Sequence, residues 1–458
     1  FIFMRPRLTP YPSGSIRELF TIAWPMILAN AVGCFMLLID RILLARYHMD
    51  SFNACFAAAQ WYWGFYITTL TIVSIVGVFI GQLNGAQRYT EIGSAVWQMI
   101  WFCIALYGLF IPLTIWGIPH LLADPVSALG TPYLRILMLF LPIQCIGYGA
   151  LAAFFVGRGT TKVIPVVSFF ANLLNALFDI ILIFGVTLGN TVIIPELGIV
   201  GAALATILAQ GLSTGFLAYL FFQKTNRERY GTGDYRVKPT FLSKCLRTAT
   251  PPALNSCINS LCWAAMIQVI TAHASSISLQ AYGMTHLIYI AFDTLIEGVA
   301  AGTRTVCANA IGGQQWSVLK YNCFAWGILM LCVVAFVGIA MLGYPEWLIE
   351  TFLNPQSPDV IPFTVQMLSW AWIAFVLESA VSNLLNTLTA AGDTRFTMLV
   401  NTTSFLCLTV IPTYIGVIYF HQGPLMWWYC VIVDKCMRIF CFGQRYRSGI
   451  WRQKTLIR

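Results

Sequence analysis

Long apolar runs dominate this sequence and limit what it can fold into. Runs of about twenty residues or more follow one another along the chain, separated by short polar gaps. Only 9% of the 458 residues are charged and 59% are hydrophobic, so a soluble fold could not cover its surface with polar groups. Inside a bilayer the backbone must satisfy its own hydrogen bonds, which leaves helices or a closed barrel. Barrel strands would alternate apolar and polar residues, whereas these runs are continuous, so we expect an all-α integral membrane protein.

The runs predict about twelve transmembrane helices. We place them at roughly 17–45, 54–83, 94–118, 131–156, 163–187, 198–222, 246–272, 279–310, 320–343, 361–390, 396–419 and 425–443. Fourteen cysteines are spread along the chain without a C-x-x-C pair, so we interpret them as packing residues and expect no structural metal.

Basic and acidic residues in the segments between predicted spans are found on opposite sides of the membrane. A formal charge of +9 would suggest nucleic acid for a soluble chain, but here it follows membrane topology, and we expect no nucleic-acid partner. The basic side includes Arg5, Arg7, Arg88, Arg158, the run from Lys224 to Arg247 and the tail from Lys435 to Arg458, and the acidic side includes Asp50, Asp124, Glu196 and Glu346. The positive-inside rule therefore predicts that both termini and the middle loop are cytoplasmic, which requires an even number of spans.

The most polar stretch, 223–245, divides six predicted spans from six. We expect an amino-terminal six-helix lobe at 1–222, a cytoplasmic linker loop at 223–245, and a carboxy-terminal six-helix lobe with a basic tail at 246–458. Short motifs recur in order in both halves: "WPMILAN" at 24–30 with "TPPALNS" at 250–256, "LNGAQRY" at 83–89 with "IGGQQWS" at 311–317, and "GTTK" at 159–162 with "GDTR" at 392–395. The offsets between their first residues are 226, 228 and 233. Because six is even, the halves run in the same direction, which predicts a pseudo-two-fold axis along the membrane normal.

Five acidic residues fall inside predicted spans: Asp40, Asp179, Asp293, Glu297 and Glu378. A charge at the centre of a bilayer costs a few kcal/mol, so intramembrane acids are rare and usually mark ion or substrate pathways. These five are therefore the main functional candidates.

Asp179 and its neighbours form the strongest candidate. Asn175 precedes Asp179 by one turn, so the two side chains leave the same helix face, and Thr206 adds a hydroxyl from the next span. With Asp40 in the first span, these oxygens suit sodium, and a buried carboxyl equally suits a proton. The structural alternative is a hydrogen-bonded pair of Asn175 and Asp179.

Pro25 bends the first predicted span, and a bend there could move Asp40 when its protonation changes. For Asp40 the structural alternative is an ion pair with Arg41 at the outer end of the helix.

The second half offers Asp293 and Glu297, one turn apart, and Glu378 in the tenth span. We interpret them as lining a substrate cavity or as a second coupling site. His286 is interpreted as a core residue.

No enzyme motif survives inspection. "GRGTTK" lacks the spacing of a phosphate loop, and neither G-x-S-x-G nor H-E-x-x-H occurs. We expect no enzyme activity and no cofactor. Because the internal loops are too short for a nucleotide-binding domain, energy for any transport must come from an ion gradient.

Over nearly its whole length the chain resembles the multidrug and toxic compound extrusion (MATE) family of the bacterial type. The resemblance rests on "FTIAWPMILAN", "GQLNGAQRYTEIG", "GRGTTKVIPVV…ANLLNALFDIILIFG", "LGIVGAALATILAQ", "IEGVAAGTRT" and "AAGDTRF", in this order.

The resemblance implies an antiporter that exports amphipathic, often cationic small molecules against inward flow of protons or sodium. It implies a cation site at Asp40, Asn175, Asp179 and Thr206, a hinge at Pro25 and a further acid at Glu378. Two departures are Asn259, where many members have a glutamate, and Arg41, where a small polar residue is usual. We also expect a monomer in contact with membrane lipid, located in a bacterial inner membrane.

Two other functions stay open from the sequence. A flippase for lipid-linked oligosaccharides is the alternative within the wider superfamily, although such relatives usually have about fourteen spans. A channel or receptor without coupled transport is the alternative of a different class.

Overall fold

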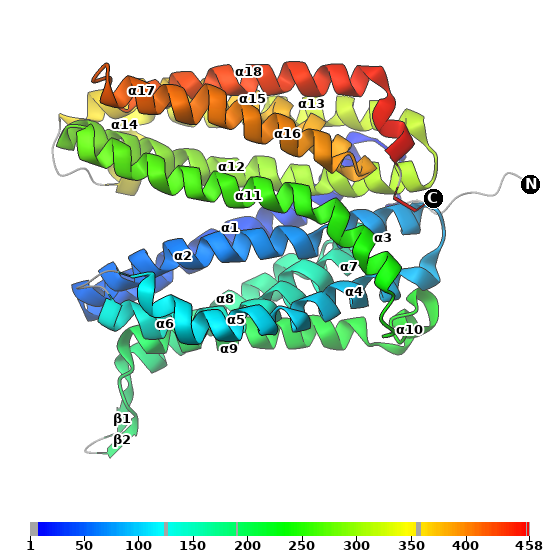
Figure 1. The fold of residues 1–458 in the computed structure, drawn as a ribbon, viewed down its shortest axis with the longest axis horizontal. Helices are drawn as coiled ribbons and strands as arrows, with labels where there is room; N and C mark the ends of the chain where they lie inside the picture. The colour runs from blue at the N-terminus through cyan, green and yellow to red at the C-terminus, as the bar shows by residue number, and fades with distance from the viewer. Residues whose placement is uncertain (1–7, 123–126, 189–190, 354–358, 455, 458) are drawn as a thin grey trace, which may run out of the picture. The chain divides into compact units, whose positions relative to one another are not determined.

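The chain folds almost entirely into helices. The computed structural model describes residues 8–122, 127–188, 191–353, 359–454 and 456–457 (Figure 1). In this part the strands are β1 (Val186–Leu188) and β2 (Thr191–Ile194), which form one antiparallel hairpin. The predicted all-α membrane fold is confirmed. Arg5, Arg7 and Asp124 of the charge pattern lie outside the described residues.

Two compact units make up the chain. One comprises Phe1–Ile27 with Ile258–Arg458, and the other comprises Leu28–Cys257. Their boundaries fall inside two long helices, α1 (Ile16–Tyr47) and α11 (Pro239–His273), rather than in a loop. Each unit is described by itself below as the amino-terminal unit (28–257) and the carboxy-terminal unit (1–27 with 258–458).

The amino-terminal unit packs its helices around aromatic and aliphatic side chains such as Phe79, Phe154 and Phe221, which are fully buried. Besides its part of α1 and α11 it contains α2 (Met49–Ser74), α3 (Val76–Gly85), η1 (Tyr89–Glu91), α4 (Ile92–Ala105), α5 (Tyr107–Pro112), η2 (Leu113–Gly117), η3 (Ile118–His120), α6 (Ser127–Cys145), η4 (Ile146–Leu151), α7 (Ala152–Gly157), α8 (Val163–Phe184), α9 (Gly198–Phe221) and α10 (Lys224–Tyr230).

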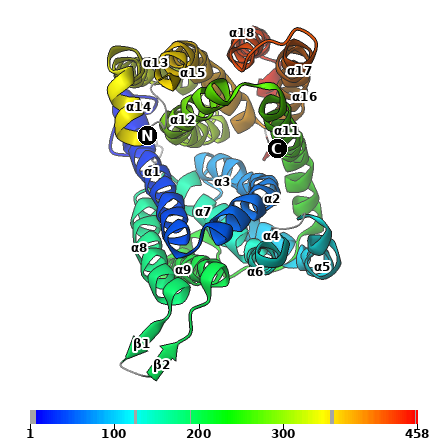
Figure 2. The ribbon, with the colours of Figure 1, turned by 90° about the vertical axis from the view of Figure 1, so that its left-hand side faces the viewer.

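The carboxy-terminal unit has a continuous core that includes Trp326, Phe375 and Trp428. Its elements are the remainder of α1 and α11, α12 (Ser276–Gly312), α13 (Trp316–Gly338), η5 (Ile339–Gly343), α14 (Pro345–Leu353), α15 (Val360–Ala391), α16 (Thr394–Ser404), η6 (Phe405–Val410), α17 (Ile411–Ile418), α18 (Leu425–Ser448) and η7 (Ile450–Lys454). Within this unit α15 packs against both α12 and α18 (Figure 2).

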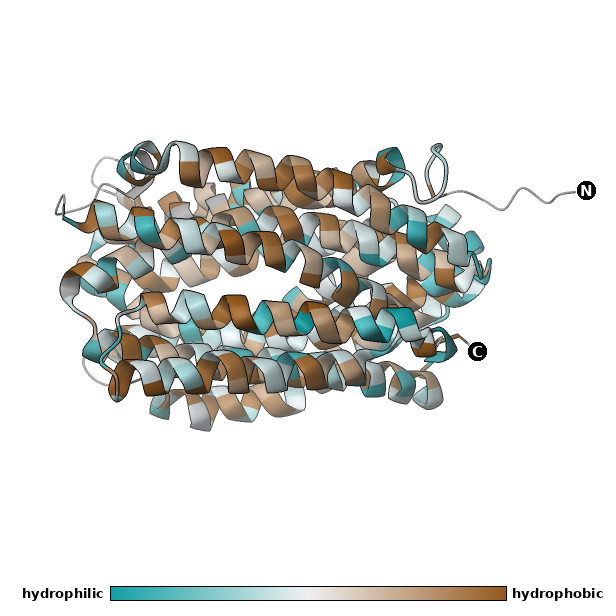
Figure 3. Ribbon diagram, turned by 90° about the horizontal axis from the view of Figure 1, so that it is seen from above, coloured by the Kyte–Doolittle hydropathy of each residue, from teal (hydrophilic) through white to brown (hydrophobic). Residues whose placement is uncertain are grey.

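Eleven helical segments in the described part are long and apolar enough to cross a membrane, and they match the first eleven predicted spans. The twelfth predicted span lies in α18, which is not among these eleven segments. It contains the charged residues Asp434, Lys435 and Arg438 and is therefore less apolar than the others. Apolar residues fill the middle of most helices, while polar residues gather toward helix ends (Figure 3).

Within the described ranges, four spans contain a short π-helical segment: η2, η4, η5 and η6. Three of them lie close to a proline, at Pro112, Pro142 and Pro412, where the loss of a backbone donor disturbs the α-helical ladder. The segments η2 and η5 start at Leu113 and Ile339, which is an offset of 226 residues. The same local irregularity thus occurs at equivalent positions of the two sequence halves.

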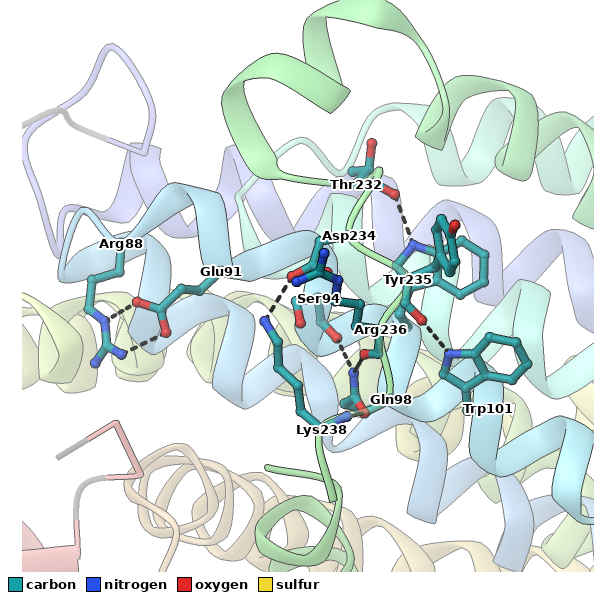
Figure 4. Close-up of polar contacts among 11 residues, drawn as sticks. Arg88, Glu91, Ser94, Gln98, Trp101, Thr232, Asp234, Tyr235, Arg236 and Lys238 are labelled. Atoms are coloured by element: carbon teal, nitrogen blue, oxygen red, sulfur yellow. Dashed lines mark hydrogen bonds and ion pairs between the residues drawn. The ribbon is translucent and has the colours of Figure 1, made fainter. Parts of the chain in front are cut away.

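The polar stretch between the halves is held against α4 rather than left free. After α10 the chain turns at Thr232 and Gly233 and continues without helix or strand to Lys238. Three side chains of α4 bind the backbone of this segment: Trp97 and Trp101 donate their indole N–H to Thr232 O and Tyr235 O, each at 2.8 Å. Gln98 donates to Arg236 O at 3.0 Å and accepts from the Lys238 N–H at 2.8 Å (Figure 4). An ion pair of 2.8 Å between Lys238 and Asp234 holds the pKa of Asp234 below its usual value.

Candidate functional site

Asp179 and Asn175 lie on the buried face of α8 in the amino-terminal unit. Their side chains are 0% and 1% exposed. Both oxygens of Asp179, and both Oδ1 and Nδ2 of Asn175, have no hydrogen-bond partner among the described residues. No hydrogen bond therefore joins the pair, and the four polar atoms are available to a ligand.

Asp40 approaches this pair from α1. Its carboxyl group interacts with that of Asp179, and its buried Oδ1 has no hydrogen-bond partner in the described part of the chain. Arg41 adds its charge to the surroundings of Asp40, while its guanidinium lies 5.1 Å from the centre of the Phe56 ring. The structure thus brings together the two amino-terminal acids that the sequence singled out.

Close packing of α8 on α9 sets the position of the pair. Gly201 of α9 faces the backbone carbonyl of Leu182, and a Cβ at Gly201 would collide with that oxygen. On the same helix the Thr206 hydroxyl donates to Ala202 O at 3.0 Å, which leaves its oxygen free to accept. No hydrogen bond joins Thr206 to Asp40 or Asp179 in the described structure, so the role of Thr206 stays a prediction.

Two neighbouring buried carboxyl groups cannot both stay charged without compensation. Burying one unpaired carboxylate is costly, and a second one nearby adds repulsion. A proton shared within the pair or a bound sodium ion removes that cost. The oxygen-only donor set of Asp40, Asn175 and Asp179 fits either cation.

Glu378, in the carboxy-terminal unit, has a partner that the sequence reasoning missed. The Lys435 ammonium forms an ion pair with the Glu378 carboxylate, and the Lys435 and Glu378 side chains are 9% and 22% exposed. The sequence pattern assigned Lys435 to the cytoplasmic tail, which is wrong, because α18 continues to Ser448 and buries Lys435 along its length.

Two further charged residues of α18 were also missed. Arg438 pairs with Asp434 at 2.7 Å and donates to the Ser404 hydroxyl at 3.1 Å. Both charges are nearly buried. Their spacing within an apolar run, at 434, 435 and 438, was the signal that could have identified a polar helix face.

Asp293 and Glu297 lie one turn apart on α12, as predicted from their spacing. Asp293 Oδ1 is buried and has no hydrogen-bond partner among the described residues, whereas the Glu297 side chain is exposed. Arg304 interacts with Glu297 and donates to Asn386 Oδ1 at 2.8 Å. Asp293 and Glu297 each interact electrostatically with Glu378, but no hydrogen bond joins any two of these three acids in the described structure.

His286 and Pro25 both lie inside long helices, α12 and α1. The His286 ring stacks on Trp263 at 4.3 Å between centroids, but its buried Nδ1 has no hydrogen-bond partner among the described residues, so the satisfied core position expected for His286 is not observed. Pro25 lies within a continuous α1, two residues before the boundary between the units, so its role as a hinge stays a prediction. Asn259 Oδ1 is buried and lacks a hydrogen-bond partner in the described part.

Comparison with known proteins decides the family. The sequence profile of the family described as MatE matches residues 25–181 and again residues 251–415, which together cover more than half of the chain. The chain belongs to the MatE family. The two MatE matches start 226 residues apart, which is the offset found between the repeated proline motifs and between the π-helical segments η2 and η5.

Individual MATE relatives agree with this assignment. The chain is 24% identical to the "Probable multidrug resistance protein NorM" of Thermotoga maritima, over 96% of this chain and 94% of that protein. It is 23% identical to the "Uncharacterized transporter YisQ" of Bacillus subtilis, over 97% of each. A crystal structure of MATE in complex with MaD3S superposes with a TM-score of 0.81 at 19% identity, over 96% of this chain and 98% of that one. The protein is thus a multi-pass membrane transporter and not an enzyme, as predicted.

Proposed function

We propose that this MATE protein is a cation-coupled antiporter that exports amphipathic, cationic small molecules by alternating access. The observation that carries the proposal is the buried group of Asp179, Asn175 and Asp40, whose polar atoms lack partners in the described structure. The names of the relatives, which include multidrug resistance proteins, support the substrate class.

The coupling step uses the charge of the carboxyl pair. A proton or a sodium ion that enters from outside neutralises Asp179 and Asp40, and the loss of repulsion lets α1, α8 and α9 repack around them. This repacking favours release of substrate outward. When the site opens inward, the cation leaves, the carboxylates regain their charge, and the cycle restarts.

The basic residues support an orientation with both termini and the linker in the cytoplasm of a bacterial cell. Arg88, Arg158, Arg227, Arg229 and Lys238 lie in the described segments that join spans on one side of the amino-terminal unit. Positively charged loops are retained inside during insertion. We expect the transporter to act as a monomer in the inner membrane, in contact with lipid.

Asp179→Asn tests the proposal. The amide keeps the size of the side chain but cannot gain or lose the charge, so we expect gradient-driven export from proteoliposomes to fall by about tenfold or more. Asp50→Asn is the matched control, since Asp50 is an exposed acid of the same unit and its change should leave export intact. Normal coupled export by a folded Asp179→Asn variant would refute the assigned role.

A further inference from the structure

Charged residues gather on three helices of the carboxy-terminal unit that pack together. Up to Arg438, the described residues of α12, α15 and α18 include the acids Asp293, Glu297, Glu378 and Asp434 and the bases Arg304, Lys435 and Arg438. Since α15 packs against α12 and α18, these charges lie on adjoining helices within one unit. The acids outnumber the bases by one.

Two of the acids form an ion pair with a base, and a third interacts electrostatically with one. Asp434 pairs with Arg438 at 2.7 Å, Glu297 interacts with Arg304, and Glu378 pairs with Lys435. Asp293 is the acid that remains, and its buried Oδ1 has no hydrogen-bond partner among the described residues.

Lys435 interacts with both the paired acid, Glu378, and the unpaired acid, Asp293. Its ammonium binds Glu378 on α15, and it lies 6.0 Å from the centre of the Tyr289 ring on α12. Tyr289 precedes Asp293 by one turn and so shares its helix face, and Lys435 also acts electrostatically on Asp293. One cluster therefore contains Lys435, Glu378, Tyr289 and Asp293.

We propose that Lys435 is a resident cation of the carboxy-terminal unit. Its ammonium takes the position beside Glu378 that a mobile cation would need, and Asp293 is the acid left to interact with a mobile cation, either coupling ion or substrate. The assignment of a transport role to Asp293 rests on the proposed antiport function, whereas occupation of the Glu378 position by Lys435 does not.

The chemistry of a buried pair explains why the lysine excludes other cations. A carboxylate whose charge is balanced by a tethered ammonium gains little from a proton or a sodium ion, because either would have to displace the ammonium and leave it unpaired. Removing the lysine reverses this situation, since the carboxylate must then find another cation.

Lys435→Met tests the resident cation directly. We expect the purified variant to hold one more cation than the wild-type protein, seen either as a new infrared band of a protonated carboxyl group or as additional radioactive sodium in equilibrium dialysis. The infrared band identifies a proton and the dialysis identifies sodium. The added cation should disappear in the double variant Lys435→Met/Glu378→Gln.

Lys224→Met is the control for loss of a lysine. Lys224 is 90% exposed and lies 3.9 Å from Glu228. Because both side chains of this pair are in contact with solvent, loss of the lysine should not cause the protein to bind another cation. A folded Lys435→Met variant with neither a new carboxyl band nor additional sodium would overturn the proposal.

The double variant keeps the proposal testable if Lys435→Met alone does not fold. It removes both charges of the Lys435–Glu378 pair, so neither is left without its partner, and we expect it to fold and to retain gradient-driven export. Loss of coupling in the folded double variant would show that Glu378 itself carries the coupling ion and would refute the inference.

Asp293→Asn tests the second half of the proposal. Loss of its charge should raise the half-saturating concentration of a cationic substrate or of the coupling ion by about tenfold. Unchanged values for both would contradict the role of Asp293. If export by the wild-type protein did not depend on any ion gradient, antiport would be contradicted. The cation binding measured for Lys435→Met would still stand.

Discussion

At the scale of single residues, sequence patterns identified the polar groups but not their partners. The four-residue spacing of Asn175 and Asp179 in an apolar run was enough to predict one buried helix face, and the structure places both there. The partner of Glu378 could not be predicted in the same way. Lys435 is 57 residues further along the chain, so only packing of α15 on α18 brings the two charges together.

Gly201 should be essential for the position of the α8 acids. An added methyl group in Gly201→Ala would collide with Leu182 O, and such overpacking costs about 1–3 kcal/mol. We expect the midpoint of thermal unfolding in detergent to fall accordingly. Gly215→Ala is the matched control on the same helix, because a Cβ there meets nothing within 4 Å. Equal midpoints for the two variants would contradict close packing at Gly201.

At the scale of elements, apolar runs predicted the transmembrane helices well because burial in lipid demands about twenty apolar residues whatever their order. The π-helical segments η2 and η5 and the short helix α10 were not predicted. The hydropathy of a sequence does not indicate where backbone hydrogen bonds change from the α-helical to the π-helical pattern near a proline or a glycine. Likewise, the contacts of Trp97 and Trp101 with the linker involve backbone carbonyls, which any sequence supplies.

The linker should loosen when Gln98 is replaced. Gln98→Ala removes the acceptor of the Lys238 N–H and the donor to Arg236 O, so we expect amide exchange at 236–238 to accelerate by about tenfold. Hydrogen–deuterium exchange with mass spectrometry measures this. Glu91→Gln breaks an exposed ion pair with Arg88 in the same unit and should leave amide exchange of the linker unchanged. Protection of 236–238 that persists in Gln98→Ala would show that the linker is held by other contacts.

At the scale of the whole molecule, charge between the spans predicts an orientation, and repeated motifs predict two equivalent halves. The duplication is supported by the two MatE matches at an offset of 226. The structural boundaries between the compact units fall at Ile27 and Cys257, inside α1 and α11. They lie within or next to the repeated proline motifs at 24–30 and 250–256, but nothing in these motifs indicates a boundary between units. A helix that passes from one unit to the other has the same apolar composition as one that does not.

Orientation can be tested with an impermeant thiol reagent in intact cells. In a variant without native cysteines, a single cysteine at the exposed linker position Lys224 should be labelled only after the membrane is opened, because we expect the linker to be cytoplasmic. A cysteine at Asp50, which is also exposed, should be labelled in intact cells. The opposite pattern would invert the proposed topology.

Coupling of export to an ion gradient is the most direct measure of the proposed function. Wild-type protein in proteoliposomes should export a cationic amphipathic dye when a proton gradient or a sodium gradient is imposed alone, and the effective gradient identifies the ion that occupies the site of Asp40 and Asp179. Export at the same rate with neither gradient present would contradict coupled antiport and favour an uncoupled channel.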